Sequence, residues 1–453
     1  MRSVAVIGNG VVGSVVAGCF ALLGRHVVGV ETDQRRLAVL QAGRAPVRED
    51  GLDALLTSGI ASGRLRFTDD LGEALACSSA VFLCTGGSVE TAREVLGACR
   101  EDHIVVVKST LPIGTTGSVV PGPVVCNPEF LRQGSAIADF LHPDRVVLGA
   151  DDHDAMDVVV ELYRPILEQT VPGREPSRRP VLVRTSIAAA EMVKHASNAF
   201  LALKVSFANE LGNICAAAGV DVGEVTEAVG LDGRIGLAHL AAGLGWGGSC
   251  LGKDLTALIE AARDRGYEPR LLAEVAAVNA RQRRLALDKL QAHLGELAGR
   301  RVCLLGLAFK PGTDDLRDAP ALEVAAALLG LGAAVTAYDP AVQAVAELPG
   351  LVVASDVYEA AAGADAVVLV TDWPEFALLD VAELRSRMRG NLFVDGRNIL
   401  GGVGLSDAGF VYESFGGSGQ RRRLRPVPTR ETAPTPAVDS VEATPRRSQA
   451  SPR

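Results

Sequence analysis

Cys250 is the residue of this chain whose type and surroundings best suit nucleophilic chemistry. It stands in the run Gly247-Gly248-Ser249-Cys250-Leu251-Gly252-Lys253-Asp254. The glycines before it allow backbone or a ligand to approach the sulfur closely. If a helix begins at Leu251, its N-terminal dipole would favour the thiolate over the thiol. The other interpretation is a small buried residue in a tight turn, which is the commoner use of a cysteine.

A second motif predicts that the chain binds a dinucleotide. Gly8-Asn9-Gly10-Val11-Val12-Gly13 follows an apolar run and precedes a helical pattern, so a pyrophosphate could lie at a helix N-terminus. Glu31 follows Gly13 by 18 residues, where a carboxylate would accept bonds from the adenosine ribose. That carboxylate favours NAD over NADP, although Arg36 weakens the preference. A thiol and a hydride acceptor in one chain suggest oxidation of a carbonyl through a thioester.

Further polar residues stand where the ends of predicted strands and one helix face could bring them together. Thr110 follows a predicted strand in KSTLP, and Glu129 follows another in NPEFL. Taken alone, Glu129 is more often an ordinary loop residue. Lys194 and Asn198 are four residues apart and share one face of a mostly apolar helix. Lys194 therefore either meets an anion or extends to water at the edge of the helix.

Other charged residues carry weaker signals. Arg234 and Arg397 each follow an Asp-Gly pair, where an arginine could bind phosphate or a base, although each alone is more often a surface charge. The histidines at 142, 153, 195 and 239 lack metal-ligand spacing. We therefore assign them no role and predict no metal.

The elements that must position these residues form two α/β regions around a helical one. The alternation predicts two doubly wound α/β domains joined by a long central helical region. The expected boundaries are 1–185, 186–298 and 299–415, followed by a disordered tail over 416–453. An exposed loop is expected over 172–180. The predicted strands are Val4–Ile7, His26–Val30, Ala80–Leu83, Ile104–Lys108, Val124–Cys126, Arg145–Leu148, Arg301–Leu305, Ala334–Tyr338, Val352–Val353, Ala366–Val370 and Leu392–Val394.

Composition excludes several classes of protein. A net charge of -9, with no basic stripe before the tail, argues against nucleic acid as a partner. The eight cysteines are scattered without a CxxC pair, which favours a reducing cytoplasm over disulfides or zinc. The first predicted strand leaves no room for a signal peptide, and no apolar stretch is typical of a membrane span. We expect a soluble cytoplasmic enzyme.

Eight runs in sequence give the chain a resemblance to a known family. It resembles the UDP-glucose/GDP-mannose dehydrogenase family over roughly residues 1–415. The resemblance implies oxidation of the C6 alcohol of a nucleotide sugar to the carboxylate with two NAD, on two Rossmann-like domains joined by a helix that forms a dimer. The runs are GNGVVG, KSTLPIGTT, NPEFLRQGSAIADF, AEMVKHASNAFLALKVSFANE, DGRIG, GWGGSCLGKD, GLAFKPGTDDLRDAP and VDGRN.

The resemblance also implies a role for individual residues. Cys250 would capture the C6 aldehyde as a thiohemiacetal, which the second oxidation turns into a thioester. Lys194 and Asn198 would stabilise the oxyanion, Asp254 and Thr110 would hold a water, and Glu129 would assist hydrolysis. The implied NAD-binding residues are Gly8, Gly10, Val11, Val12, Gly13, Glu31, Arg36, Thr110, Lys253 and Arg317. The implied substrate-binding residues are Phe130, Leu131, Lys194, Asn198, Arg234 (toward a neighbouring subunit), Gly247, Lys310 and Arg397.

The chain departs from the family pattern at a few places. Gln133 stands where the family commonly has a glutamate, so a second carboxylate near the water is missing. The loop over 84–88 is shorter than usual and lacks its proline, which affects the expected cofactor contacts. Trp246 and His239 replace other aromatics expected near the sugar nucleotide. The changes at Trp246 and His239 bear on substrate identity more than on the reaction.

Local features favour UDP-glucose as the substrate. PDRVVLG, Tyr267-Glu268-Pro269 and Val278-Asn279 look closer to the UDP-glucose branch than to the GDP-mannose branch. dTDP-glucose is the main alternative, because a pocket distinguishes one methyl group by only about 1–3 kcal/mol. The other alternative is a non-catalytic protein that binds NAD and a sugar nucleotide, which would not need Cys250, Lys194, Asn198, Asp254 and Glu129 together.

Overall fold

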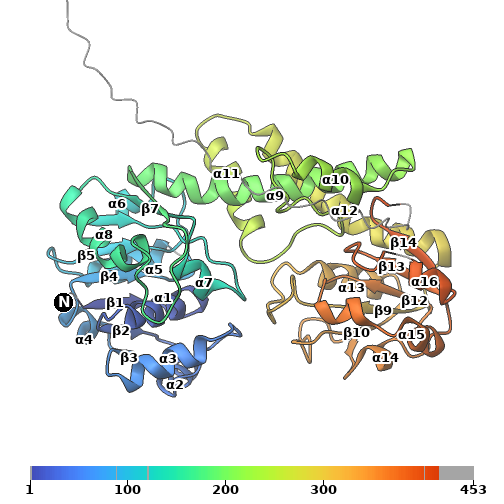
Figure 1. Ribbon diagram of the computed structural model, residues 1–453, viewed down its shortest axis with the longest axis horizontal. Helices are drawn as coiled ribbons and strands as arrows, with labels where there is room; N and C mark the ends of the chain where they lie inside the picture. The colour runs from blue at the N-terminus through green and yellow to red at the C-terminus, as the bar shows by residue number, and fades with distance from the viewer. Residues whose placement is uncertain (1–2, 88, 120–121, 402, 418–453) are drawn as a thin grey trace, which may run out of the picture. The chain divides into compact units, whose positions relative to one another are not determined.

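Two mainly parallel sheets and a set of long helices make up the described part of the chain. A computed structural model describes residues 3–87, 89–119, 122–401 and 403–417 (Figure 1). The predicted strands are all present, each within one residue of its expected ends. The expected disorder of the tail falls on residues 418–453, which lie outside the described residues.

The first sheet has eight strands in the order β3-β2-β1-β4-β5-β6-β7-β8. All neighbouring pairs are parallel except β6 and β7, which share one antiparallel bridge. Its central strands are buried along their whole length, as expected of a sheet covered on both faces. The strands are β1 (Val4–Ile7), β2 (Val27–Val30), β3 (Leu65–Thr68), β4 (Ala80–Leu83), β5 (Ile104–Val107), β6 (Val124–Cys126), β7 (Arg145–Gly149) and β8 (Val181–Thr185).

The helices of this region cover the two faces of the first sheet, over two apolar cores. Pro172 to Arg179 are exposed without regular structure, as expected of that loop. The helices are α1 (Val11–Leu22), α2 (Gln34–Gln41), α3 (Leu52–Ala61), α4 (Leu71–Ala76), α5 (Val89–Gly97), α6 (Thr116–Val119), α7 (Ala136–Leu141) and α8 (His153–Leu167).

Helices alone fill the segment between the two sheets. The longest, α9 (Ile187–Ala218), begins where the Ser186 side chain accepts the Ala189 N–H and ends at Gly219 with a φ of 69°. It packs on β6 and β7 at one end and on α11 and α12 further along. The remaining helices are α10 (Val222–Gly230), α11 (Leu251–Arg263) and α12 (Arg270–Leu294). Among the residues that the structure describes, no helix has both the length and the apolar character needed to span a bilayer.

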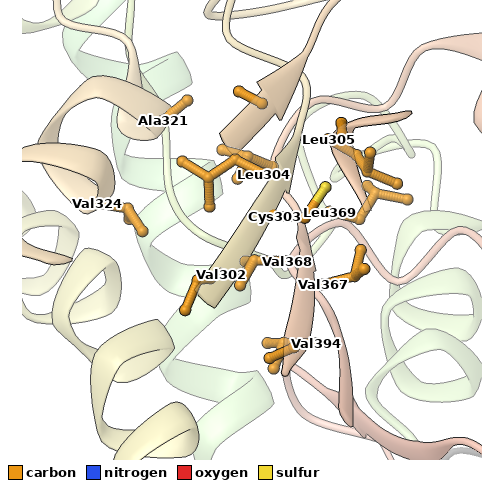
Figure 2. Packing of buried hydrophobic residues seen from close by; sticks show 14 of the residues in the cluster. Val302, Cys303, Leu304, Leu305, Ala321, Val324, Val367, Val368, Leu369 and Val394 are labelled. Carbon is orange, nitrogen blue, oxygen red and sulfur yellow. The ribbon is translucent and has the colours of Figure 1, made fainter. Parts of the chain in front are cut away.

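The second sheet repeats the strand order of a dinucleotide-binding fold, β11-β10-β9-β12-β13-β14, with every pair parallel. Figure 2 shows its core, where side chains of β9 and β12 pack against α13. The strands are β9 (Arg301–Leu305), β10 (Ala334–Tyr338), β11 (Leu351–Val353), β12 (Ala366–Leu369), β13 (Leu392–Asp395) and β14 (Val411–Ser414). The helices are α13 (Pro320–Gly330), α14 (Val357–Ala360), the 3-10 helix η1 (Pro374–Leu378), α15 (Val381–Arg387) and α16 (Val403–Asp407).

Three strands that the sequence pattern missed lie at sheet edges. They are β3, β8 and β14, and each carries polar or exposed residues. An edge strand need not be apolar on both faces, so it lacks the continuous apolar run that marks a central parallel strand.

The two sheets use the acidic residue at the end of their second strand differently. In the first sheet, Glu31 accepts one N–H from the glycine-rich turn, that of Asn9. In the second, Asp339 accepts the N–H groups of Leu307 and Ala308 at 2.7 and 3.0 Å and that of the Trp373 indole at 3.1 Å. One Asp339 oxygen thus serves three donors, all from the protein. The Leu307 and Ala308 N–H groups are therefore already bonded within the chain.

Candidate active site

The thiol of Cys250 lies at the N-terminus of α11. Cys250 is the N-cap residue and its carbonyl accepts the Asp254 N–H at 2.9 Å. Its side chain is exposed, which excludes the interpretation as a small buried core residue. Gly247 precedes it, and a Cβ there would come 2.2 Å from the carbonyl oxygen of Asp318, so only glycine fits. Trp246 lies beneath α11, with its indole N–H 3.1 Å from Ser206 Oγ.

A buried ion pair joins the helix α9 to the segment after β6. Lys194 Nζ lies 2.7 Å from Glu129 Oε1 and also donates to the Glu129 carbonyl at 2.8 Å. Both side chains are buried. The lysine therefore does not extend to water, and its anion is a carboxylate of the chain itself. The Phe130 ring lies under both Lys194 and the Arg145 guanidinium, and Leu131 N donates to Glu129 Oε2 at 2.7 Å.

A second buried carboxylate lies on the first turn of α11. Asp254 Oδ2 accepts a hydrogen bond of 2.5 Å from Asn198 Nδ2, one turn along α9 from Lys194. Lys253 Nζ lies 2.9 Å from Asp254 Oδ1. The packing of α9 against α11 thus brings Lys194, Asn198 and Asp254 to the same region as Cys250.

The glycine-rich turn before α1 has the features of a dinucleotide site. A Cβ on Gly13 would meet the Gly8 carbonyl oxygen at 1.9 Å, whereas a Cβ on Gly10 would meet nothing within 4 Å. The N-terminus of α1 has no side-chain cap and no acidic residue in its first turn, so its N–H groups suit an anion. Val11 and Val12 are the first residues of this helix, and the turn carries no acidic side chain that would repel a pyrophosphate.

Glu31 and Arg36 interact at the position expected for the ribose. Glu31 is buried and accepts the N–H groups of Asn9 and Asp33 at 3.2 and 3.0 Å. Arg36 Nη1 lies 3.7 Å from Glu31 Oε2. A carboxylate offers about four acceptor positions, so Glu31 retains capacity for a ribose hydroxyl. The residues present therefore fit NAD.

Thr110 lies beside the loop that the sequence marked as shortened. Gly87 in that loop adopts a φ of 86°, and a Cβ there would come 2.8 Å from the Thr110 carbonyl oxygen. Ser109 Oγ, next to Thr110, donates to the Thr85 carbonyl at 2.8 Å. These contacts fix the backbone of residues 84–87 against the end of β5.

The lysine and arginines that were expected to bind ligands lie in different surroundings. Two of them, Lys310 and Arg317, lie near Cys250. Lys310 donates to the Gln133 carbonyl; burial lowers its pKa, whereas Glu49 and Cys250 act in the opposite direction. Hydrogen bonding to Asp315 raises the pKa of Arg317, and the charge of Cys250 adds to this effect. Both cations therefore lie within electrostatic range of the thiol.

Two arginines stand apart from that group. Arg397 is half-buried and donates to the carbonyls of Val370 and Gly245 at 2.6 and 3.0 Å, and burial lowers its pKa. Arg234 is 89% exposed and pairs only with nearby Asp232, at 2.6 Å. Within the described chain the structure does not bring Arg234 to Cys250. His239 is also exposed, with a φ of 64°.

A cavity of about 260 Å³ lies beside Arg397. Its walls come from α10, the segment over 237–242 and β14, and none of the predicted catalytic residues lines it. Across the described residues, no group of three or more His, Cys, Asp or Glu side chains could hold a metal ion.

The sequence reasoning missed three buried polar residues around the site. Glu49 accepts the N–H groups of Gly134 and Ala136 at 2.6 and 2.7 Å and so fixes the segment that carries Gln133. Lys108 is buried against Asn127 and Tyr163. His195, a buried residue of α9, faces Asp254 of α11. Nothing in the local pattern distinguishes these residues, although a Lys or Glu inside an apolar run is a weak signal of burial.

Three models of one family match the chain in order. Its NAD binding domain matches residues 2–167, its central domain residues 188–281 and its UDP binding domain residues 303–402. The chain belongs to the UDP-glucose/GDP-mannose dehydrogenase family. The match to the family's NAD binding domain includes the glycine-rich turn over residues 8–13.

Named relatives agree with this assignment. The UDP-glucose 6-dehydrogenase of Rhizobium meliloti is 42% identical over 441 residues, covering 91% of this chain and 99% of the relative. That of Haloferax volcanii is 44% identical over 442 residues, covering 90% and 99%. The structure of a UDP-glucose dehydrogenase from Pyrobaculum islandicum matches with a TM-score of 0.83 at 38% identity, covering 92% of this chain and 98% of that one.

Proposed function

We propose that this family member oxidises the C6 alcohol of UDP-glucose to the carboxylate of UDP-glucuronate. The observation that carries the proposal is the exposed Cys250 thiol at the N-terminus of α11, beside buried Lys194, Asn198 and Asp254. A protein that only bound NAD and a sugar nucleotide would not need a thiol and two buried carboxylates together. The relatives named UDP-glucose 6-dehydrogenase support the choice of sugar.

Cys250 divides the oxidation into steps that keep the sugar attached to the protein. NAD, when bound, accepts one hydride in each of two oxidations. The sulfur adds to the C6 aldehyde to give a thiohemiacetal, and oxidation of that adduct leaves a thioester. Water then breaks the carbon–sulfur bond and regenerates the thiol. The alcohol and one water become the carboxylate, with two hydrides and three protons released.

The neighbouring residues have separate tasks in this proposal. The Lys194 ammonium and the Asn198 amide stabilise the oxygen that becomes negative at C6. Asp254 and Thr110 hold the hydrolytic water, and Glu129, paired with Lys194, assists hydrolysis. Gln133 supplies only its backbone carbonyl, to Lys310. One carboxylate, Glu129, therefore serves where the family pattern offers two.

We also assign residues to the binding of NAD and of the sugar nucleotide. The turn over 8–13, with Glu31 and Arg36, binds the adenosine half of NAD, and Thr110, Lys253 and Arg317 lie toward the reacting end. Phe130, Leu131 and Gly247 contact the sugar, and Lys310 and Arg397 bind the nucleotide. The domain limits at residues 185, 298 and 415 stay predictions.

We also propose that the protein is a homodimer through α9. Phe200, Phe207 and Ile214 follow one another at intervals of seven residues, and their side chains are 62%, 53% and 59% exposed. Such spacing places them on one stripe of the helix, and an exposed stripe of large apolar side chains is typical of an interface. Arg234, free of other partners than Asp232, would then reach the substrate of the second copy.

The absence of disulfide bonds between the eight cysteines, all of which lie in the described part of the chain, is consistent with a reducing compartment such as the cytoplasm. All eight cysteines are free, and burial raises the pKa of Cys19, Cys84, Cys126 and Cys303, so these four are inert.

The decisive experiment counts NADH and acid together. The purified protein is mixed with NAD and, separately, UDP-glucose, dTDP-glucose, GDP-mannose or UDP-N-acetylmannosamine. We expect two NADH per acid, with UDP-glucose clearly preferred by kcat/KM. One NADH per turnover, with aldehyde released, would contradict the thioester route. Binding of NAD without any oxidation would support the non-catalytic alternative, and a preference for dTDP-glucose would correct the nucleobase.

A further inference from the structure

Arg283, on α12, is a buried cation that the proposed mechanism leaves without a task. Its Nη2 donates to the Trp246 carbonyl at 2.7 Å. Its Nη1 donates to Asp318 Oδ1 at 2.9 Å and to Glu323 Oε2 at 2.6 Å. Trp246 begins the run that leads to Cys250, and Asp318 stands just before α13. One side chain therefore bonds two segments that are far apart in the sequence.

The backbone between Trp246 and Cys250 has few restraints of its own. Two of the residues between them, over 247–249, are glycines, which tolerate a wide range of conformations. On α12, Asn279 accepts the Trp246 N–H at 2.9 Å and donates to the Trp246 carbonyl at 3.0 Å. The position of the sulfur therefore depends on how α12 holds Trp246 and on what packs against the glycines.

Asp318 packs against those glycines. It adopts a φ of 48°, a left-handed conformation that costs energy for a residue with a side chain. Its carbonyl oxygen accepts the Gly248 N–H at 3.3 Å, and a Cβ on Gly247 would come 2.2 Å from that oxygen. A Cβ on Gly252, in the first turn of α11, would come 3.5 Å from its Oδ2. Asp318 thus lies close to the chain both before and after the thiol, and Arg283 fixes its carboxylate.

Stability alone gives little reason to bury this arginine. The side chains of Asp318 and Glu323 are 42% and 50% exposed, so water could solvate both carboxylates without it. The Arg283 side chain is 8% exposed, and its Nε has no hydrogen-bond partner within the described chain. Burying an ion is costly, and its partners often do no more than offset that cost. What this side chain alone supplies is a rigid fork of donors that bonds Trp246 and Asp318 together.

We propose that Arg283 is a positioning residue, which sets where the Cys250 sulfur lies by bonding Trp246 and Asp318 at the same time. The inference rests on the proposed function. Because Arg283 is buried and its bonded donors face the protein, it acts through these two residues and not on the sugar.

Only the second oxidation depends on the position of the sulfur. In the first, C6 gives up a hydride and the alcohol gives up a proton, and no bond to sulfur forms. In the second, the sulfur bonds to C6 of the aldehyde and the thiol proton passes to the carbonyl oxygen. The adduct then loses a hydride to NAD and a proton to water. A misplacement of about 1 Å can cost about a hundredfold in the rate of such a step.

Three variants distinguish this role from general packing. Arg283→Met keeps an apolar stem and removes every donor. Arg283→Lys keeps the charge without the fork. Asp318→Asn keeps a residue type that tolerates the left-handed backbone and removes the charge that Arg283 bonds. Arg284→Met is the matched control, because Arg284 is the next residue of α12 and is exposed.

The C6 aldehyde of UDP-glucose, supplied directly, reports on each oxidation separately. With NADH it is reduced to the alcohol, which reverses the first oxidation and needs no sulfur. With NAD it is oxidised to the acid, which needs the Cys250 adduct. Both rates are measured in single turnovers by NADH absorbance, and Cys250→Ser defines the rate without a thiol.

We expect Arg283→Met to reduce the aldehyde within about threefold of the wild-type rate and to oxidise it at least about tenfold more slowly. Arg283→Lys should recover part of the oxidation, and Asp318→Asn should lose part of it. Arg284→Met should match the wild type in both reactions.

Either of two results would overturn the proposal. Equal losses in reduction and oxidation would show that Arg283 only supports the fold. Unchanged oxidation in Arg283→Met would show that it does not position the sulfur. If Arg283→Met does not fold, Asp318→Asn decides by the same two rates.

Hydrogen exchange tests the same point without any turnover. The amide hydrogens of a peptide covering residues 246–252 should exchange at least about threefold faster in Arg283→Met than in the wild type. The Trp246 and Gly248 N–H groups are held by the segments that Arg283 joins, so both should be released. Arg284→Met should leave this exchange unchanged. Equal exchange in the wild type and Arg283→Met would overturn the proposal. Wild-type protein that neither oxidises nor reduces the aldehyde would defeat the proposed function, while exchange would still decide whether Arg283 holds this segment.

Discussion

At the scale of single residues, the site is built from buried charges that meet partners within the chain. Lys194 meets Glu129, and Asp254 meets Asn198 and Lys253. Removing one partner of a buried ion pair commonly costs about 3–5 kcal/mol, because the other charge is left in an apolar environment. Lys108 differs, since its hydrogen-bond partners Asn127 and Tyr163 are neutral.

Replacing the thiol tests the covalent route. Cys250→Ser should reduce acid formation by at least about a thousandfold, because the nucleophile of the thioester route is lost. NAD binding, measured by fluorescence titration, should stay at the wild-type level. Cys77→Ser is the matched control, because Cys77 is also an exposed free thiol and lies at the end of α4 rather than at the start of α11. Full acid formation by Cys250→Ser would contradict the covalent mechanism.

Burial of Lys108 predicts a distinct dependence of stability on pH. Desolvation lowers the pKa of Lys108 from 10.5 to about 8. Between these values the unfolded chain binds one more proton than the folded chain, so this residue makes stability rise with pH. Relative to Lys108→Met, the wild type should gain about 3 kcal/mol of unfolding free energy between pH 7 and pH 10.5.

Urea unfolding at a series of pH values measures that difference. Lys289→Met serves as the control, because Lys289 pairs with Glu413 near the surface at 2.7 Å. A wild-type-minus-Lys108→Met difference that does not change with pH would show that Lys108 titrates alike in both states.

At the scale of elements, two helix N-termini carry the chemistry. The N-terminus of α1 has no side-chain cap and opens on the space beside Gly10, and that of α11 carries Cys250. In both, the N–H groups of the first turn can stabilise negative charge at the helix end, which is where we propose the pyrophosphate in one case and the reacting sulfur in the other.

Only one of two glycine substitutions in the turn before α1 should affect folding. Gly13→Ala forces a Cβ to 1.9 Å from the Gly8 carbonyl oxygen, so the melting temperature should fall and NAD binding should be lost. Gly10→Ala meets nothing within 4 Å, so the melting temperature should stay near the wild-type value. Its methyl group would occupy the space for the pyrophosphate, and NAD affinity should fall by about tenfold or more, which corresponds to about 1.4 kcal/mol. Thermal melts with and without NAD distinguish these outcomes, and unchanged NAD affinity in Gly10→Ala would contradict the placement of the cofactor.

At the scale of the whole molecule, the six strands of the second sheet repeat the order of the first six strands of the first sheet. The second sheet lacks the open glycine-rich turn, because Asp339 holds the Leu307 and Ala308 N–H groups and a Cβ on Gly306 would meet Thr371 at 2.4 Å. The helical segment between the sheets carries Lys194, Asn198 and Cys250, to which we assign the catalysis, and also the exposed apolar stripe. In this proposal, catalysis and assembly share α9.

The apolar stripe of α9 predicts how the protein assembles. Phe207→Asp should convert a dimer into a monomer, because a carboxylate would be buried in the interface without a partner. Light scattering coupled to gel filtration measures the mass. Val352→Asp is the control, since Val352 is an exposed apolar residue on β11, at the edge of the second sheet. A monomeric wild-type protein, or dissociation by both variants alike, would contradict an interface on α9.

Much of this protein could be predicted from its sequence, because the relevant signals are local. Central parallel strands are apolar along their length, a glycine-rich turn must precede a dinucleotide-binding helix, and the motif around Cys250 occupies consecutive residues. The three edge strands escaped prediction because their polar residues face water on one side. The partners of buried charges depend on packing between segments far apart in the chain. Only the tertiary structure pairs Lys194 with Glu129, 65 residues away, and brings His195 opposite Asp254.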